Sequence, residues 1–395
     1  MAHNLAIAAD DLDRIADAAD MHGIDLTIVG PELPLALGLA DRLRAEGRAV
    51  FGPGAAAAQI EASKTFAKEV MASAGVRTAA SRSFVDLPAA LAFLDRHPEP
   101  LVVKASGLAA GKGAIVCTTR QEGAKAVRAM LEEGQFGEAG RTVVIEAYLE
   151  GEEISVMAVT NGRDLELLPV AQDHKRLLEG DLGPNTGGMG AYSPVAIAGP
   201  GLLEKVKRDI LLPTLEELQR MRTAFSGVLY AGLMIDGAGV PWVVEFNCRF
   251  GDPEAQVVLP LIAEGLTDCL LRVARGESPS RMNVSRGAAV TTVLAARGYP
   301  DHPEKGPPVV LPEVLPPTVT IFHAGTVRGP DNILRVDGGR VLTTTAVGAS
   351  FGEAQQLSRE AAEAVQFDGK IFRRDIGWRE AERLQARRLM SAPRV

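Results

Sequence analysis

The chain has 395 residues, which is long enough for two or three domains and a substantial hydrophobic core. It carries 42 Lys and Arg against 50 Asp and Glu, a net charge of −8, which argues against a nucleic-acid or membrane-surface partner. Hydrophobic residues make up 46%, as in globular proteins, and no apolar run reaches membrane-spanning length, so we expect a cytoplasmic protein without nucleic-acid or membrane partners.

Residues 1–62 have an α/β pattern. Helices are predicted at 12–22 and 33–46, and strands at 26–29 and 49–51. Gly30-Pro31-Glu32 follows the first of these strands. Open α/β sheets bind ligands at the carboxyl ends of their strands, so this turn is a candidate binding position.

From residue 63 the pattern becomes α+β. Ser63 is a predicted N-cap for a helix that ends near Ala74, with Gly75 behind it. Strands are predicted at 101–104, 114–118, 142–148, 154–160 and 165–170, and two more within 227–248. Beyond residue 284 the chain is strand-rich again, at 288–296, 318–323 and 340–346, and a helix at 351–365 closes this part.

The three cysteines, Cys117, Cys248 and Cys269, are odd in number and form no Cys-x-x-Cys pair. We expect them to be reduced, buried thiols and not a disulfide frame or a zinc site.

The segment from Trp242 to Glu254 is the most informative. On one strand, Glu245, Asn247 and Arg249 would all point to the same side of a sheet. Carboxylate and amide oxygens suit Mg²⁺, and an arginine adds a cationic fork for a phosphoryl group. The alternative is a structural charge pair in a buried strand.

A glycine-rich loop at 107–113 joins two predicted strands. It is not a P-loop, because the spacing is one residue short and Gly113 stands where Ser or Thr would be needed. Its backbone N–H groups can still close over phosphates. Lys104 ends an apolar strand just before the loop, which favours an anion partner over a surface position. Lys64, at a helix start, is as readily an exposed lysine as a phosphate ligand.

Two further segments are candidates for substrate contact. Glu146 and Glu153 flank an apolar hinge, where one carboxylate could meet an exocyclic amine and the other a ribose diol. Asp173-His174-Lys175 precedes a run at 183–194 with four glycines and two prolines, which is too irregular for helix or strand. Long ordered loops of this kind are usually functional.

These motifs together resemble the phosphoribosylamine–glycine ligases, a family of ATP-grasp enzymes of purine biosynthesis. The resemblance rests on KASGLAAGKG at 104–113, QDHKR at 172–176, GPNTGGMGAYSP at 183–194 and EFNCRFGDPE at 245–254. HAGT at 323–326 and DIGWR at 375–379 extend it through nearly the whole chain.

The resemblance implies a multidomain α/β and α+β fold. Residues 1–62 would be a partial N-terminal α/β substrate domain, 63–283 an ATP-grasp domain with a lid subdomain at about 76–150, and 284–395 a small strand-rich C-terminal domain. It also implies that glycine, ATP and 5-phosphoribosylamine give glycinamide ribonucleotide, ADP and phosphate through glycyl phosphate, with Mg²⁺ or Mn²⁺ as the metal. We expect the chain to be a monomer or a weak homo-oligomer.

Site residues follow from the same resemblance, position by position. Glu245 and Asn247 would bind the metal, and Arg249 and Lys104 would be catalytic. The acceptor would be bound by Glu32, Asp173, His174, Lys175, Gly188, Met189 and Asp252. ATP would be bound by Lys64, Lys104, Gly107, Gly111, Lys112, Gly113, Glu146, Tyr148, Leu149 and Glu153, with the backbone of 147–149 at the adenine.

The chain departs from the family pattern in two places. Ser106 stands where the family often has Asp, which is tolerable. The family's opening glycine-rich strand–loop–helix, of about 30 residues by the size of such a unit, is expected to be missing. Two alternatives therefore remain beside an active ligase: an ATP·Mg-binding remnant with impaired acceptor binding, and an ATP-grasp ligase with another amine acceptor.

Overall fold

The structure is a computed structural model that describes residues 3–109 and 111–391. It divides into two compact units. The first comprises residues 1–168, 200–250 and 265–282, and the second comprises 169–199, 251–264 and 283–395. Among the described residues, none of the helices combines the length and the apolar character that a membrane crossing requires.

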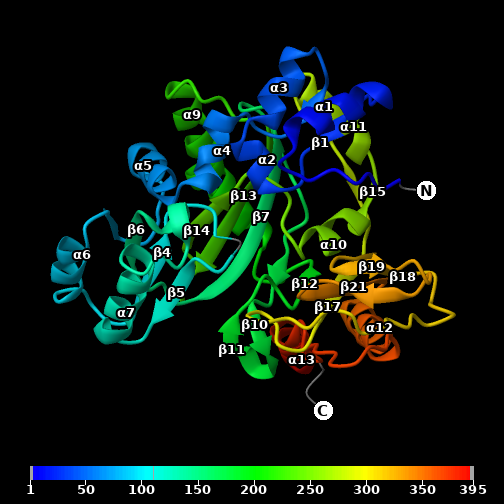
Figure 1. The fold of residues 1–395 in the computed structure, drawn as a ribbon. Coiled ribbons are helices and arrows are strands. Elements are labelled where there is room, and N and C mark those ends of the chain that lie inside the picture. Colours follow the sequence, from blue (N-terminus) through cyan, green and yellow to red (C-terminus); the bar gives the residue numbers. More distant parts are fainter. Residues whose placement is uncertain (1–2, 110, 392–395) are drawn as a thin grey trace. The chain divides into compact units, whose positions relative to one another are not determined.

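The first unit begins with an α/β segment (Figure 1, blue). It contains α1 (Leu12–Met21), β1 (Thr27–Ile28), α2 (Glu32–Ala36), α3 (Leu39–Ala45), β2 (Val50–Phe51) and α4 (Ala55–Ala62), and β1 pairs with β2 in parallel. The predicted helix at 33–46 is wrong in one respect. Gly38, with a φ of +90°, interrupts it, and two short helices replace the single one.

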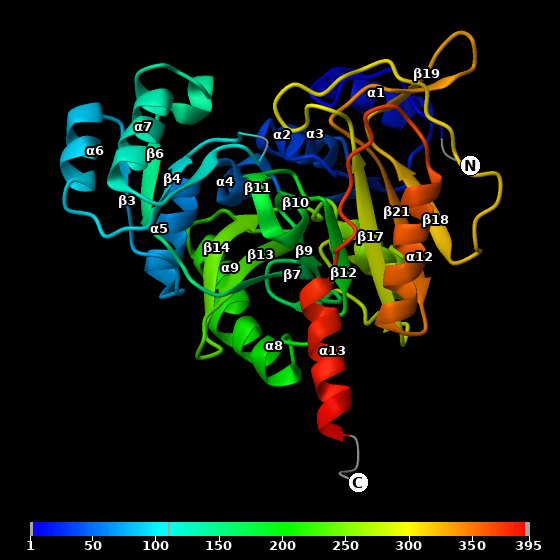
Figure 2. The same cartoon turned by 90° about the horizontal axis from the view of Figure 1, so that it is seen from below.

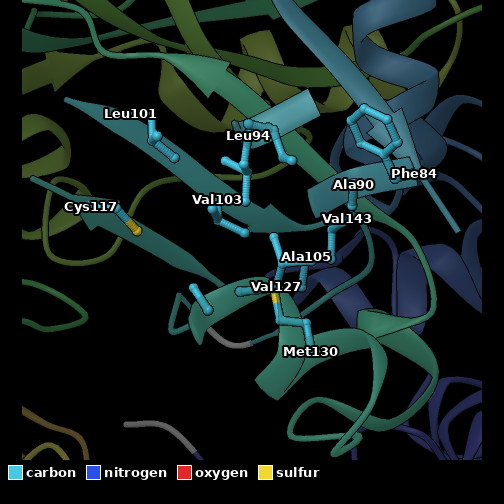
Figure 3. Close-up of a cluster of buried hydrophobic side chains, with 12 residues drawn as sticks. Phe84, Ala90, Leu94, Leu101, Val103, Ala105, Cys117, Val127, Met130 and Val143 are labelled. Carbon is cyan, nitrogen blue, oxygen red and sulfur yellow. The ribbon is translucent and has the colours of Figure 1, made fainter. Parts of the chain in front are cut away.

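An antiparallel sheet with the order β3-β6-β4-β5 forms the next part of this unit. Its strands are β3 (Ser81–Phe84), β6 (Val143–Ala147), β4 (Leu101–Ala105) and β5 (Ala114–Cys117). Helices α6 (Leu87–Leu94) and α7 (Arg120–Leu131) pack against it. Figure 3 shows the shared core, in which Leu94 and Met130 from the helices meet Leu101, Val103 and Cys117 from the strands.

A second antiparallel sheet of this unit has the order β14-β13-β7-β8. Its strands are β14 (Pro241–Asn247), β13 (Gly227–Ile235), β7 (Glu152–Thr160) and β8 (Leu165–Leu167). Helix α5 (Lys64–Ala74) packs against β14. It begins and ends as predicted, with Ser63 accepting a hydrogen bond from the Phe66 N–H and Gly75 in the left-handed region. Helices α8 (Pro200–Val206), α9 (Leu212–Arg220) and α11 (Leu266–Ala274) complete the unit.

The second unit is built on a five-stranded antiparallel sheet with the order β18-β21-β17-β12-β9. The strands are β18 (Val319–His323), β21 (Arg340–Gly348), β17 (Ala288–Ala295), β12 (Gly190–Ser193) and β9 (Gln172–Asp173). Helix α12 (Phe351–Ala364) packs against β17 and β21 (Figure 2). The other elements are α10 (Ala255–Val258), α13 (Trp378–Ser391) and the antiparallel strand pairs β10–β11 (Arg176–Leu178, Leu182–Asn185), β15–β16 (Ile262–Glu264, Asn283–Val284) and β19–β20 (Thr326–Arg328, Leu334–Val336).

Two expectations about this unit are corrected. The run at 183–194 is not irregular throughout, because β12 is an inner strand of the sheet, paired with β17 on one side and β9 on the other. Backbone pairing to distant strands overrides its unfavourable composition. The helix predicted at 351–365 is α12, but it does not close this part of the chain, since α13 follows it. The three cysteines are buried and unbridged, as predicted.

Candidate active site

The end of β14 carries the predicted metal ligands. Glu245 pairs with Gly232 and Asn247 with Tyr230, so the two side chains point to the same face of the sheet. A register shift between Val243 and Glu245 marks a bulge just before them. Gly232 lies directly beside Glu245, since a Cβ on Gly232 would be in van der Waals contact with Glu245 Cγ at 3.4 Å.

Arg249 does not extend this row, which corrects the expectation of three side chains on one strand. The strand ends at Asn247, and Arg249 lies in the bend that follows. Its guanidinium contacts two carboxylates of the α/β segment. Arg249 Nε lies 3.1 Å from Glu32 Oε2, and Nη2 lies 2.8 Å from Glu61 Oε1. Glu32, a predicted substrate ligand, is therefore next to Arg249, and Glu61 is a second partner that was not predicted.

Strand register also brings Glu153 to the face of Glu245. Ser155 pairs with Gly232, and Gly232 pairs with Glu245, so these positions form one row across β7, β13 and β14. Glu153 is two residues from Ser155 on β7 and faces the same side. Glu153 and Glu245 are two strand spacings apart across the sheet and two residues apart along it, a separation of about 12 Å. The predicted ribose and metal positions thus share one surface.

Two lysines from different elements lie close to that surface. Lys104, at the end of β4, is 4% exposed, and its Nζ donates to the Val244 carbonyl at 3.1 Å, at the bulge of β14. Lys64, in the first turn of α5, donates from Nζ to the Gly107 carbonyl at 3.4 Å. Burial lowers the pKa of Lys64, while the charge of Glu245 opposes this and that of Lys104 adds to it. A pair of lysines, one buried and one half-buried, would suit an anionic ligand.

Glu146 on β6 is buried between positive charges, an arrangement that was not predicted. Its Oε2 lies 2.8 Å from Lys104 Nζ and its Oε1 lies 3.0 Å from Lys68 Nζ. Lys68 also donates to Thr78 Oγ1 at 2.7 Å. The sequence did contain a signal for Lys68, because it lies one turn after Lys64 on α5, and two lysines at this spacing repel each other unless an acid lies near.

The chain leaves β6 after Ala147 and runs through residues 148–151 to β7. Tyr148 is exposed and Leu149 is half-buried, and β7 begins at Glu152. The predicted adenine contacts therefore lie on a strand-to-strand connection between Glu146 and Glu153.

The glycine-rich loop connects β4 to β5 as predicted, apart from Ala110, which lies outside the described residues. Gly107 packs closely against Ala139, because a Cβ at position 107 would lie 2.6 Å from the Ala139 backbone. Gly111 has a φ of +75°, which favours glycine. Lys112 donates its backbone N–H to the Ala109 carbonyl at 2.9 Å, and a Cβ on Gly113 would lie 2.6 Å from Ala109 Cβ.

Ser106 links this loop to α5. Its Oγ accepts from the Thr65 N–H at 3.2 Å, and its carbonyl accepts from the Lys64 N–H at 2.8 Å. The serine thus fixes the start of the helix that carries Lys64.

The second unit holds most of the predicted acceptor ligands. Asp173 on β9 pairs with Ala191, and the next two residues pair with the glycine-rich run: the His174 N–H donates to Gly190 and the Thr186 N–H donates to the Lys175 carbonyl. Met189 is fully buried and donates its N–H to the His174 carbonyl. The structure thus brings Asp173, His174, Lys175, Gly188 and Met189 together.

Asp252 is held against the same run. Its Oδ2 lies 2.6 Å from Arg340 Nη2, and Arg340 Nη1 donates to the Gly187 carbonyl at 2.6 Å. Gly188, with a φ of +104°, packs so closely on Pro253 that a Cβ would lie 2.5 Å from its Cδ. Arg340 was not predicted, because nothing in its local sequence indicates a partner 88 residues away.

His174 is 2% exposed, and its contacts are internal. Its Nε2 accepts from the Gly377 N–H at 2.8 Å, and its Nδ1 lies 3.6 Å from Asp181 Oδ1. Asp181 in turn pairs with the buried Arg373 at 2.9 Å. Burial lowers the pKa of His174. A direct contact of this histidine with a substrate stays a prediction.

The donor set at the end of β14 fits a magnesium ion. One carboxylate and one amide leave most coordination positions to phosphate oxygens and water, as Mg²⁺ prefers. Within residues 3–109 and 111–391, no group of three or more His, Cys, Asp and Glu side chains is arranged to hold a metal by itself. A donor set of this kind would suit a metal ion shared with a phosphate ligand.

Comparisons with known proteins cover almost the whole chain. Three phosphoribosylglycinamide synthetase models match it: the N domain at residues 1–61, the ATP-grasp (A) domain at 62–255 and the C domain at 289–379. The expected loss of part of the N-terminal domain is not supported, because the N-domain model matches residues 1–61.

Individual relatives agree with the models. The chain is 46% identical to the phosphoribosylamine–glycine ligase of Nostoc sp., over 95% of this chain and 89% of that protein. It is 45% identical to the trifunctional purine biosynthetic protein adenosine-3 of Bos taurus, over 97% of this chain and 38% of that protein.

Solved structures give the same fold. The crystal structure of the phosphoribosylamine–glycine ligase of Thermotoga maritima is 39% identical, with a TM-score of 0.75 over 83% of this chain and 81% of that one. The biotin carboxylase domain of the Hydrogenobacter thermophilus 2-oxoglutarate carboxylase is 16% identical, with a TM-score of 0.72 over 93% of this chain and 81% of that one, and shares the fold alone. The fold is a multidomain α/β ATP-grasp architecture, and the chain belongs to the phosphoribosylglycinamide synthetase (phosphoribosylamine–glycine ligase) family.

Proposed function

We propose that this chain is a phosphoribosylamine–glycine ligase, which joins glycine to 5-phosphoribosylamine with ATP as co-substrate. The products are glycinamide ribonucleotide, ADP and phosphate. The proposal is supported by family membership together with one observation: Glu245, Asn247 and Glu153 face one side of a sheet whose edge lies beside Lys64 and Lys104.

The first step activates glycine. A glycine carboxylate oxygen attacks the γ-phosphorus of ATP, the bond to the β-γ bridging oxygen breaks, and ADP leaves. The demand on the protein is positioning and charge neutralisation, since phosphoryl transfer needs no protein nucleophile. Lys64 and Lys104 would hold the phosphates under the loop at 107–113, and Arg249 would stabilise the charge of the transferred group.

The second step forms the amide. The amine of phosphoribosylamine attacks the acyl carbon of glycyl phosphate, phosphate leaves with both electrons of the broken acyl carbon–oxygen bond, and the amine loses a proton. Asp173, Lys175, Gly188, Met189 and Asp252 are proposed to line the acceptor site, together with Glu32 and His174. Each of these roles is a proposal from the family resemblance.

A divalent metal, Mg²⁺ or Mn²⁺, is proposed to be held by Glu245 and Asn247. When bound, it would neutralise phosphate charge during transfer. The proposed nucleoside ligands are Glu146, the connection at 147–149 with Tyr148 and Leu149, and Glu153. The other proposed phosphate ligands are Gly107, Gly111, Lys112 and Gly113.

A coupled assay of ADP release by the full chain tests the function. We expect release that requires Mg²⁺, glycine and phosphoribosylamine together, with glycinamide ribonucleotide identified by mass spectrometry. Release with other amines but not with phosphoribosylamine would support a different acceptor. ATP binding without any turnover would support a nucleotide-binding remnant, and ADP release independent of both substrates would refute the ligase.

A further inference from the structure

Glu61 is a buried carboxylate on which several donors converge. It lies in the last turn of α4 and is 8% exposed. Its Oε2 accepts from the Cys248 N–H at 2.8 Å and from Cys248 Sγ at 3.2 Å. Its Oε1 lies 2.8 Å from Arg249 Nη2. One side chain of the α/β segment thus holds both the backbone and the arginine that follow Asn247.

The guanidinium of Arg249 is oriented by more than this one contact. Its Nε lies 3.1 Å from Glu32 Oε2, and its Nη1 donates to the Phe250 carbonyl at 3.1 Å. Because the guanidinium is planar, three contacts to its three nitrogens fix the plane of the fork. The two carboxylates differ in exposure, since the side chain of Glu32 is 29% exposed and that of Glu61 is 6% exposed.

Packing alone does not account for a carboxylate at this position. Burial raises the pKa of Glu61, and the charge of Arg249 and the Cys248 N–H oppose the shift. A buried ion pair commonly adds little stability over well-packed apolar side chains. Most other positions of α4 are alanine, so the packing of this helix does not in general require a buried charge. The geometry of Arg249 is the feature that requires an acid here.

We infer that Glu61 is a positioning residue that holds Arg249, and the peptide after the proposed metal ligand Asn247, in the geometry needed for phosphoryl transfer. The inference rests on the proposed function. Glu61 acts through Arg249 and does not itself touch the reacting atoms. A small displacement of a positioned group is enough to lower a rate by about 100-fold.

The variant Glu61→Gln tests this role because it keeps the size of the side chain and removes its charge. We expect kcat for ADP release to fall by about 10- to 100-fold, while the KM for ATP changes by less than about threefold. Glu61→Asp, which keeps the charge on a shorter stem, should recover part of the loss. It also serves as the second variant if Glu61→Gln does not fold.

Glu217→Gln is the matched control. Glu217 is also buried, at 7% exposed, and it pairs with Arg220 Nη2 at 2.6 Å on α9. This variant loses a glutamate–arginine pair away from the proposed site, with a more exposed arginine (69% for Arg220 against 22% for Arg249), so kcat should stay within about twofold of wild type. Melting temperatures of the two variants should agree within about 3 °C. A loss of kcat at Glu61 no larger than at Glu217 would overturn the inference.

A double-mutant cycle with Arg249→Lys separates positioning from an independent effect. If Glu61 acts through Arg249, the double variant should lose no more than about twofold beyond Arg249→Lys alone. Multiplicative losses would contradict the inference. An inactive wild-type chain would overturn the proposed function along with it, whereas an active wild type with an unaffected Glu61→Gln would overturn only the role of Glu61.

Discussion

Lys104 Nζ lies 2.8 Å from Glu146 Oε2, and the other oxygen of the same carboxylate lies 3.0 Å from Lys68 Nζ. One acid therefore serves two lysines, and the side chains of all three are at most 12% exposed. A carboxylate shared between two lysines attracts each of them less strongly than it would attract one lysine alone. Lys68 thus leaves Lys104 available for an anionic ligand while keeping Glu146 compensated.

Replacing Lys68 by Met should weaken ATP binding. Without Lys68, Glu146 has only Lys104 as an ionic partner among the contacts described, so Lys104 is held back from the phosphates. We expect the dissociation constant for Mg·ATP to rise by about 5- to 10-fold and stability to fall by about 1–3 kcal/mol. Calorimetric titration and thermal unfolding measure the two effects. Lys125→Met, at an exposed position of α7, is the control and should change neither. Unaltered ATP affinity in Lys68→Met would refute the shared-acid model.

Removing the charge of Glu245 should remove metal-dependent turnover. In Glu245→Gln we expect kcat to fall at least about 100-fold, because a neutral amide binds Mg²⁺ poorly and phosphoryl transfer depends on charge neutralisation. Asn247→Ala should instead raise the Mg²⁺ concentration needed for half-maximal rate. Rates measured across a Mg²⁺ titration, with EDTA as the zero point, distinguish the two. An unchanged kcat in Glu245→Gln would exclude it as a ligand.

Local sequence patterns predicted the frame of this site well. The cap at Ser63, the stop at Gly75 and the shared face of Glu245 and Asn247 follow from short-range rules of capping and strand alternation. These features depend on residues within a few positions of one another, so a single sequence contains them.

Contacts between distant segments were beyond such rules. The predicted strand includes Arg249, but β14 ends two residues before it. The partner of Arg249, Glu61, is far away in the chain. Likewise, β12 was read as irregular because its glycines disfavour a strand, although β9 and β17 pair with it on either side. Pairing with distant segments decides whether such residues form a strand or an ion pair, and these distant partners produce no periodic pattern in the local sequence.

Gly188 should tolerate no side chain. Its φ of +104° disfavours other residues, and a Cβ would lie 2.5 Å from Pro253 Cδ. We expect Gly188→Ala to destabilise the second unit by about 1–3 kcal/mol and to lower kcat/KM for the amine acceptor more than for ATP. Gly201→Ala is the control, because a Cβ at that exposed position meets nothing within 4 Å. Equal stability of the two variants in urea unfolding would count against this reading.

The interior position of His174 predicts a loss of stability in acid. Burial lowers the pKa of His174 from its ordinary 6.5 in the folded state, and the Arg373 charge contributes, although Asp181 and Asp375 oppose the shift. The unfolded chain therefore binds the proton more readily, so this contribution is fully present above pH 6.5 and is lost as the pH falls through the folded-state pKa. The slope from one such proton is at most about 1.4 kcal/mol per pH unit. Unfolding free energies between pH 8 and 5 should fall less steeply for His174→Gln than for the wild type, and identical slopes would show that His174 is not the group responsible.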